Sequence, residues 1–334
     1  MNSFPYIIAE VASAHDGNLD RLISITDHAI QSGANAIKYQ IFNRDNLIAV
    51  SNPLYDEFGI IEIAPQDWLY LLKKISSKSI DIIIEPYDIQ SIQLVTKSSI
   101  LCDFKSPASN INDKKYLRML CEIGSKIYLS VGGATEEEIF SAVKFINNMN
   151  LKNEIILVCG FQNFPTKIED SNLAQINYFK NKLGLEICYA DHVDSNDSNL
   201  RKIIPLMALS AGAKYIEKHI TIDRENKGRD FYSSLNPIEF KDFVFELRKY
   251  FKSIGSIDEI GKTKAEEEYR KFSKRYAVTK KVINKGSRLH IDDLCFKRTN
   301  KLGISENDID LYIGKILKLN LSRNSQLLLE HFDD

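Results

Sequence analysis

The chain has 334 residues, of which 44% are hydrophobic and 27% are charged, a composition typical of a globular protein with a sizeable core. Its formal net charge of −1 gives no electrostatic reason to expect a nucleic acid or a membrane surface as a partner. The five cysteines form no C-x-x-C pair, which favours a reduced setting over a disulfide framework. Because the sequence shows neither a signal peptide nor a run of roughly 18 apolar residues, we expect a cytoplasmic protein.

Short apolar runs of β character alternate with longer amphipathic segments over most of the chain. The runs predicted to be strands are 6–12, 36–42, 81–87, 101–106, 126–132, 154–160, 185–191 and 215–221. This alternation predicts an α/β fold, a (β/α)8 TIM barrel. The alternative is a doubly wound open sheet, which would need a glycine-rich phosphate loop after the first strand. Since AEVASAHDGN offers one glycine there, we favour the barrel.

The alternation of apolar runs and amphipathic segments ends after the predicted barrel. We predict a catalytic barrel domain over residues 1–260 and a charged linker with a helical bias over 261–275. Residues 276–334 contain short β-branched runs and tight turns at 284–286 and 322–324, which predict a small β-rich domain.

In a TIM barrel the chemistry is built at the C-terminal ends of the strands. The polar residues expected there are Glu10, Ser13, His15, Lys38, Gln40, Glu85, Lys105, Ser130, Asn163, Asp191, His192, Glu217 and His219, and the loop 224–236 would bring Asp230 across the barrel mouth. A buried lysine needs an anion. We favour a phosphate or carboxylate ligand for Lys38 and Lys105, the alternative being internal salt bridges to Glu10 or Glu217.

His192 and His219 close two neighbouring predicted strands. Two imidazoles at one rim favour metal ligation, whereas two hydrogen-bonded core histidines are the alternative. Together with oxygen ligands they suit Mn²⁺, Fe²⁺, Zn²⁺ or Co²⁺, and the spacing does not choose among these metals.

Several segments together resemble the sialic acid synthase family, whose members make N-acetylneuraminate, legionaminate and pseudaminate. They are IIAEVASAHDGN, GANAIKYQIF, DHV, GAKYIEKHITIDR, GRDFYSSLNPIEF and KKVINKGSRLHIDDLCFKR. The resemblance spans nearly the whole chain, and its last part is similar to the antifreeze-like SAF (β-clip) module. It implies an enzyme of surface-glycan biosynthesis that condenses phosphoenolpyruvate with a 2-acetamido hexose, giving a nine-carbon 2-keto-3-deoxy acid and phosphate.

The resemblance also implies roles for individual residues. Around phosphoenolpyruvate it places Lys38, Gln40, Lys105, Ser130 and Asn163. A divalent metal, typically Mn²⁺ with Mg²⁺ or Co²⁺ as alternatives, would be held by His192 and His219, which with Glu10 and Asp230 form the implied catalytic set. Arg298 would reach into the partner's site of a domain-swapped homodimer.

Four positions depart from the family pattern. Glu85 stands where the family has Thr or Ser, and Ala108 and Asn110 replace a serine and a glutamate. Cys159 replaces a histidine. A carboxylate at position 85 would repel the donor's carboxylate unless it is protonated or turned away. The departures leave two alternatives: a metal-dependent aldolase or synthase with a changed donor or acceptor, and a non-catalytic relative.

Overall fold

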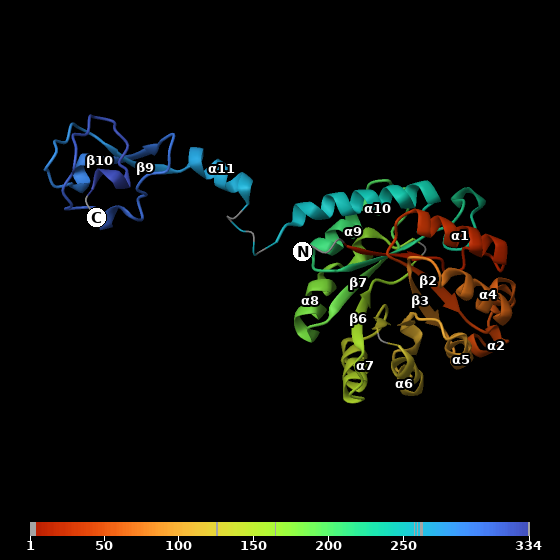
Figure 1. The fold of residues 1–334 in the computed structure, drawn as a ribbon. Helices are drawn as coiled ribbons and strands as arrows, with labels where there is room; N and C mark the ends of the chain where they lie inside the picture. The colour runs from red at the N-terminus through yellow and green to blue at the C-terminus, as the bar shows by residue number, and fades with distance from the viewer. Residues whose placement is uncertain are drawn as a thin grey trace. The chain divides into compact units, whose positions relative to one another are not determined.

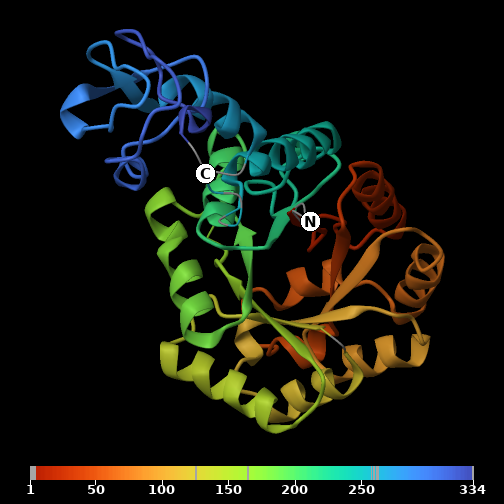
Figure 2. The same cartoon turned by 60° about the vertical axis from the view of Figure 1, so that its left-hand side comes forward.

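The structure is a computed structural model that describes residues 5–124, 126–163, 165–256, 258, 260 and 263–332. The chain divides into two compact units, Met1–Ile254 and Gly255–Asp334. In the first unit, eight parallel strands close into a barrel with helices packed around its outside (Figures 1 and 2). The predicted TIM barrel is therefore confirmed.

The barrel strands follow one another around the barrel in chain order, and β8 pairs with β1. They are β1 (Tyr6–Glu10), β2 (Ala36–Ile41), β3 (Asp81–Pro86), β4 (Asp103–Ser106), β5 (Lys126–Ser130), β6 (Glu154–Cys159), β7 (Glu186–Asp191) and β8 (Tyr215–His219). All eight predicted strands are present, and each shares one end with its predicted range and differs by one or two residues at the other.

Ten α-helices of the described part accompany these strands. They are α1 (Leu19–Gln31), α2 (Arg44–Leu47), α3 (Tyr55–Ile61), α4 (Pro65–Ile75), α5 (Ile89–Ser98), α6 (Lys114–Ile123), α7 (Glu136–Asn148), α8 (Ala174–Leu183), α9 (Leu200–Ser210) and α10 (Pro237–Phe251). Local signals explain several starts: Thr135 and Glu138 form a capping box at α7, and Pro65 opens α4. The helices α2, α3 and α8 were not predicted, and α2 and α3 are too short to show helical periodicity.

Successive side chains of a strand point to opposite faces of the sheet, and this alternation determines which residues fill the barrel. An apolar cluster lies inside it: Ile8, Ala36, Ile83, Tyr128, Ile156, Val158, Cys188, Ala190 and Tyr215. Two residues further along β1, β2, β3 and β8, and so on the same face, come Glu10, Lys38, Glu85 and Glu217. The barrel interior therefore changes from an apolar packed layer to a charged layer toward the C-terminal ends of its strands.

The second unit contains helix α11 (Lys264–Ser273) and an antiparallel pair of strands, β9 (Arg275–Thr279) and β10 (Leu294–Arg298). Its own hydrophobic core consists of Ala277, Ile283, Leu289, Leu294, Ile304, Ile309, Leu317, Leu321, Leu327 and Phe332. The predicted linker at 261–275 is thus mostly helix α11, and its first two residues lie outside the described part of the chain. Within the described residues, no helix has the length and apolar character needed to span a bilayer.

Short 3-10 helices occupy Ala108–Asn110, Ile168–Ser171, Arg224–Asn226, Lys252–Ile254, Ile291–Asp293, Ile309–Leu311 and Leu329–His331.

The loop after β1 is held in place by the side chain of His15. His15 is buried edge-on against Trp68, and its Nδ1 accepts a hydrogen bond from the Gly17 N–H at 3.0 Å. His15, which the sequence placed among the polar residues at the strand ends, therefore stabilises the loop after β1.

Gly17 provides a test of this loop. It has φ +72°, and a Cβ there would lie 2.0 Å from the Ile60 carbonyl oxygen. Gly184 has a similar φ of +66° but open space around it. We expect Gly184→Ala to cost about 1 kcal/mol of unfolding free energy from the backbone alone. Gly17→Ala should cost at least about 3 kcal/mol because backbone must also move.

The measurement is urea unfolding followed by the fluorescence of Trp68, the single tryptophan of the chain, which is buried in the barrel unit. Its signal reports on the barrel separately from the second unit. Equal losses in the two variants would contradict the close approach of Gly17 to Ile60.

Candidate active site

Five charged side chains from five strands meet inside the barrel. Glu10 ends β1, Lys38 lies in β2, Glu85 in β3, Lys105 in β4 and Glu217 in β8. All five are buried, with no more than 5% of any residue exposed. Charged groups this far from water are stable only when they neutralise one another or a ligand.

Lys38 lies at the centre of this charged layer. Its Nζ contacts the Glu10 carboxylate and lies 2.5 Å from Glu85 Oε2 and 3.1 Å from Glu217 Oε1. The other oxygen of Glu10 accepts a hydrogen bond from the Ala12 N–H at 2.6 Å. Lys38 is therefore held by carboxylates from three different strands.

Lys105 shares two of these partners. Its Nζ donates to both oxygens of Glu217, at 2.7 and 2.9 Å, and lies 3.8 Å from Glu85 Oε2. The internal salt bridges that we treated as the alternative for the two lysines are thus present in the structure. Three carboxylates face two ammonium groups, so full ionisation leaves one negative charge in excess.

The electrostatics of the cluster follow from this pairing. Burial raises the pKa of Glu217, but the ammonium groups of Lys105 and Lys38 outweigh it and hold that pKa well below its usual range. Burial lowers the pKa of Lys105, yet Glu217 and Glu85 raise it above its ordinary value. Both partners of the Lys105–Glu217 pair are therefore charged at neutral pH.

The two histidines predicted as metal ligands lie together at the rim, with ring centroids 5.0 Å apart. His192 Nδ1 lies 3.1 Å from the Ala190 carbonyl oxygen, and since a carbonyl only accepts, Nδ1 carries the proton and Nε2 is left as a ligand. His219 Nδ1 is buried without a hydrogen-bond partner among the described residues. Burial lowers the pKa of His192 well below its ordinary value and that of His219 to about 3.

Neutral imidazoles with a free nitrogen fit a divalent metal. The described residues nevertheless contain no group of three or more His, Cys, Asp or Glu side chains arranged to hold one. Two protein ligands would leave the remaining positions to water and substrate oxygens. Metal binding therefore stays a prediction that the imidazole pair supports.

A cavity of about 500 Å³ opens beside the charged layer, and Gln40 connects the two. Its Nε2 donates to Glu85 Oε2 at 3.4 Å, and its side chain also lines the cavity. Asp230 lines the same cavity, and its Oδ1 accepts a hydrogen bond from Gln162 Nε2 at 2.5 Å. The Asp230 backbone has a left-handed φ of 61°, which orients the loop at this point.

Aromatic side chains form much of the cavity wall, and sequence reasoning missed them. Phe42 packs edge-on against Phe58 and Tyr87, with ring centroids 5.5 and 6.5 Å apart. Asn110 Nδ2 donates to the Tyr87 carbonyl oxygen at 3.2 Å. The available signal was the position of Phe42 and Tyr87, which each directly follow a strand.

Three other residues that were predicted to belong to the site differ from one another in burial. Ser130 ends β5 and is buried, with its Oγ free of hydrogen bonds within the described part of the chain. Asn163 is exposed, and its backbone N–H donates to Thr166 Oγ1 at 3.1 Å. Arg298 ends β10 in the second unit and is exposed, so its implied role in a partner's site stays a prediction.

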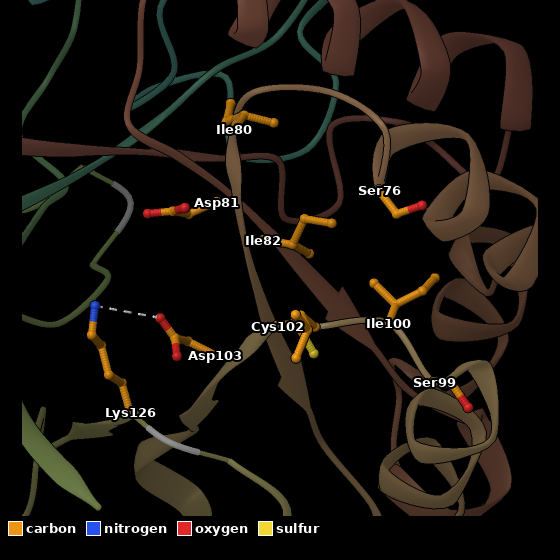
Figure 3. A pocket seen from close by; sticks show the side chains of 10 residues that line it. Ser76, Ile80, Asp81, Ile82, Ser99, Ile100, Cys102, Asp103 and Lys126 are labelled. Carbon is orange, nitrogen blue, oxygen red and sulfur yellow. Dashed lines mark ion pairs between the residues drawn. The ribbon is translucent and has the colours of Figure 1, made fainter.

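Another cavity, of about 570 Å³, lies at the N-terminal ends of the strands (Figure 3). Its lining includes the first residues of β3, β4 and β5, namely Asp81, Asp103 and Lys126, and Lys126 pairs with Asp103 at 3.9 Å. None of the predicted site residues lies there. We therefore place the candidate active site at the C-terminal end, where TIM barrels carry their chemistry.

Comparison with known proteins shows which family the chain resembles. The model of the NeuB family matches residues 25–259. The N,N'-diacetyllegionaminic acid synthase of Legionella pneumophila is 26% identical over 345 residues, covering 98% of this chain and 94% of the relative. The Campylobacter jejuni protein of the same name is 28% identical over 331 residues, covering 94% and 96%.

A solved structure agrees as well. The N-acetylneuraminic acid (sialic acid) synthetase of Leptospira borgpetersenii, crystallised with citrate, is 28% identical and superposes with a TM-score of 0.71. The match covers 80% of this chain and 92% of the other. The chain is therefore similar to sugar-acid synthases in both sequence and fold.

The charge balance of the buried cluster is testable through the Lys105–Glu217 pair. Lys105→Met leaves three carboxylates around one ammonium group and should cost about 3–5 kcal/mol of unfolding free energy. Adding Glu217→Gln restores the original excess of one charge. The loss of unfolding free energy in the double variant should therefore be smaller than the sum of the two single losses, by about 1–3 kcal/mol.

Urea unfolding followed by Trp68 fluorescence measures all three variants. Lys126→Met is the matched control, because Lys126 is half-buried and lies 3.9 Å from its partner Asp103. It should change the stability by no more than about 1 kcal/mol. Additive losses in the double variant would show that Lys105 and Glu217 do not compensate each other.

Proposed function

Because the chain belongs to the NeuB family, we propose that it condenses phosphoenolpyruvate with a 2-acetamido hexose to form a nine-carbon 2-keto-3-deoxy acid and phosphate. The observation that carries the proposal is the buried layer in which two lysines and two histidines converge at the C-terminal end of the barrel. Relatives named as legionaminic and sialic acid synthases support the same class of reaction.

The reaction consumes one water. A bond forms between C3 of phosphoenolpyruvate and the aldehyde carbon of the open-chain sugar, whose oxygen takes a proton and becomes a hydroxyl. The water oxygen adds to C2, the bond from C2 to the phosphate oxygen breaks, and phosphate leaves. The protein must therefore hold a trianionic donor against an aldehyde and supply a proton to the aldehyde oxygen.

Lys38 and Lys105 are the cations available for the donor. Their ammonium groups lie within the same cluster, since Glu217 Oε1 is 3.1 Å from one and 2.7 Å from the other. A donor phosphate or carboxylate in this layer would exchange carboxylate partners for its own oxygens. Ser130, with its free buried Oγ, is proposed as a further donor to the phosphate, together with Gln40 and Asn163.

His192 and His219 would hold the divalent metal, for which we propose Mn²⁺. When bound, the metal would polarise the sugar's aldehyde group as a Lewis acid. The low pKa of each imidazole keeps both rings neutral and able to bind a cation at neutral pH. Glu10, buried next to Lys38, and Asp230, at the cavity wall, are the carboxylates proposed to position the acceptor and handle its proton.

The cavity beside the charged layer suits an acylated sugar. Aromatic rings from Phe42, Phe58 and Tyr87 offer apolar faces to the methyl group of an acetamido substituent and to the ring hydrogens of a sugar. Asp230, Gln162 and Gln40 offer polar groups to its hydroxyls and amide. The cavity is therefore the proposed acceptor site.

The second unit has a separate proposed role. We propose that it is a SAF module and that the enzyme acts in the cytoplasm as a domain-swapped homodimer, in which Arg298 serves the partner's site. Sedimentation of the full chain and a mixing experiment with two inactive variants, one in the barrel and one at Arg298, test this assembly. Recovery of activity on mixing supports it, and continued inactivity of the mixed dimer opposes it.

Glu85 favours a second candidate function. If its carboxylate stays on Lys38 when the donor binds, the site suits a donor with less charge than phosphoenolpyruvate. A metal-dependent aldolase that uses pyruvate or another keto acid is such an enzyme. The mass of the product obtained from pyruvate, compared with that from phosphoenolpyruvate, distinguishes the two functions.

The main proposal predicts release of inorganic phosphate from phosphoenolpyruvate in the presence of Mn²⁺ and a panel of 2-acetamido and 2,4-diacetamido sugars. His192→Ala, His219→Ala or a chelator should each lower the rate by at least about a hundredfold, because the aldehyde loses its polarisation. His290→Ala is the matched control, since His290 is exposed in the second unit. Its rate should stay within about twofold of the unmodified enzyme.

Absence of phosphate with every sugar, while the protein still binds Mn²⁺, would contradict the proposed donor or reaction class. Unchanged biological output of the His192→Ala variant in its host would instead favour a non-catalytic relative. A calorimetric titration with Mn²⁺ separates loss of the metal from loss of the chemistry.

A further inference from the structure

Glu85 has an unusual place in the charged layer. Its Oε2 lies 2.5 Å from Lys38 Nζ and 3.8 Å from Lys105 Nζ, and it accepts a hydrogen bond from Gln40 Nε2 at 3.4 Å. The residue is 3% exposed. One oxygen of Glu85, like Oε1 of Glu217, therefore lies near both ammonium groups of the charged layer.

Neither lysine depends on Glu85 for a counter-ion. Without it, Lys38 still contacts Glu10 and Glu217, and Lys105 still binds both oxygens of Glu217. The four remaining groups would be electrically neutral. Each lysine would therefore keep a carboxylate partner if Glu85 moved away, and the cluster would then carry no excess charge.

Another buried lysine shows the contrast. Lys218, on the other face of β8, pairs with Asp191 at 2.7 Å, and both side chains are fully buried. That pair is one cation with one anion, as expected of a purely structural salt bridge. The charged layer inside the barrel has one anion more than it has cations, so structural neutralisation does not explain all three of its carboxylates.

The surroundings of Glu85 connect it to the cavity. Its hydrogen-bond donor Gln40 lines the cavity wall, and so does Tyr87, two residues beyond Glu85 in the chain. A ligand that enters from the cavity would meet Gln40 and the Glu85 carboxylate at the edge of the lysine pair. An incoming anion and Glu85 would therefore compete for the same ammonium groups.

We propose that Glu85 is a resident counter-ion of the donor subsite, which an anionic ligand must displace from Lys38 and Lys105 before it binds. This inference rests on the proposed function, because it takes phosphoenolpyruvate as the anion. Glu85 then acts as a specificity-determining residue: it lowers the affinity for every phosphate or carboxylate and favours ligands whose charge is high enough to replace it.

The test is the affinity of Glu85→Gln for inorganic phosphate and for phosphoenolpyruvate, measured by calorimetry in the presence of a chelator so that no metal supplies positive charge. Glutamine keeps the size of the side chain and removes its charge. We expect the Kd for both anions to fall by at least about tenfold, since the lysines lose a competing carboxylate.

Glu186→Gln is the matched control. It removes the same charge from the barrel, but at the start of β7, where Glu186 pairs with Lys214 at 3.5 Å and both side chains are partly exposed. Its Kd for the two anions should stay within about twofold of the unmodified protein. An equal gain in both variants would show that overall charge, and not the subsite, determines the affinity, which would overturn the proposal.

An unchanged or weaker affinity in Glu85→Gln would also overturn it, because Glu85 would then help to hold the lysines for the ligand. If Glu85→Gln does not fold, Glu85→Ala is measured in the same way. Failure of both variants to fold would assign Glu85 a structural role and reject the proposal. Since these titrations need no turnover, the inference and the proposed condensation can fail separately: tighter phosphate binding without any product would refute only the latter.

Discussion

The structure of this protein depends on the cost of burying ammonium groups in the barrel. Lys38 and Lys105 project into a space that is closed to water, and each requires an anion within direct contact. Carboxylates from β1, β3 and β8 supply it, so the charge balance of the site is decided by strands far apart in the chain. The proposed positions of donor, metal and acceptor all refer to this cluster.

The apolar layer below the cluster has a complementary role. Packed side chains such as Tyr128 and Tyr215 fill the barrel toward the N-terminal ends of its strands and exclude water from that side of the charged layer. In such surroundings charge interactions are stronger than in water, which favours both tight internal pairing and tight binding of a ligand that replaces it. The histidine pair lies at the rim of the same cluster, where water and substrate oxygens could complete the coordination of the proposed metal.

Membership in the NeuB family explains why lysines, histidines and a rim aspartate converge, and the departures show how this chain differs. At position 85 the Glu85 carboxylate forms a salt bridge with Lys38. At position 110 the Asn110 side-chain amide donates a hydrogen bond to the Tyr87 carbonyl oxygen. The proposed acceptor site is a cavity lined by aromatic and polar side chains. In the proposed function, the charge of Glu85 bears on the donor, and the aromatic wall bears on the acceptor.

Much of the fold and part of the site could be predicted from the sequence, because both follow from local periodicity. Apolar runs located all eight strands, and alternation placed Lys38 and Gln40 on one face and brought Glu10, Lys105, Glu217 and the two histidines to the same end of the barrel. Short helices such as α2 lack a full amphipathic repeat, so the same reasoning did not find them.

Tertiary structure alone decided which carboxylate meets which lysine. Closure of the barrel brings β8 next to β1 and carries Glu217 to both lysines, while the side-chain lengths place Glu85 between them. The aromatic cavity likewise depends on Phe58 from α3 packing against Phe42 from the loop after β2. The sequence by itself determined which residues face the barrel interior, since strand alternation is a local property. Only the tertiary structure decided the pairing of carboxylates with lysines and the shape of the cavity, because both depend on distances between residues that are remote in sequence.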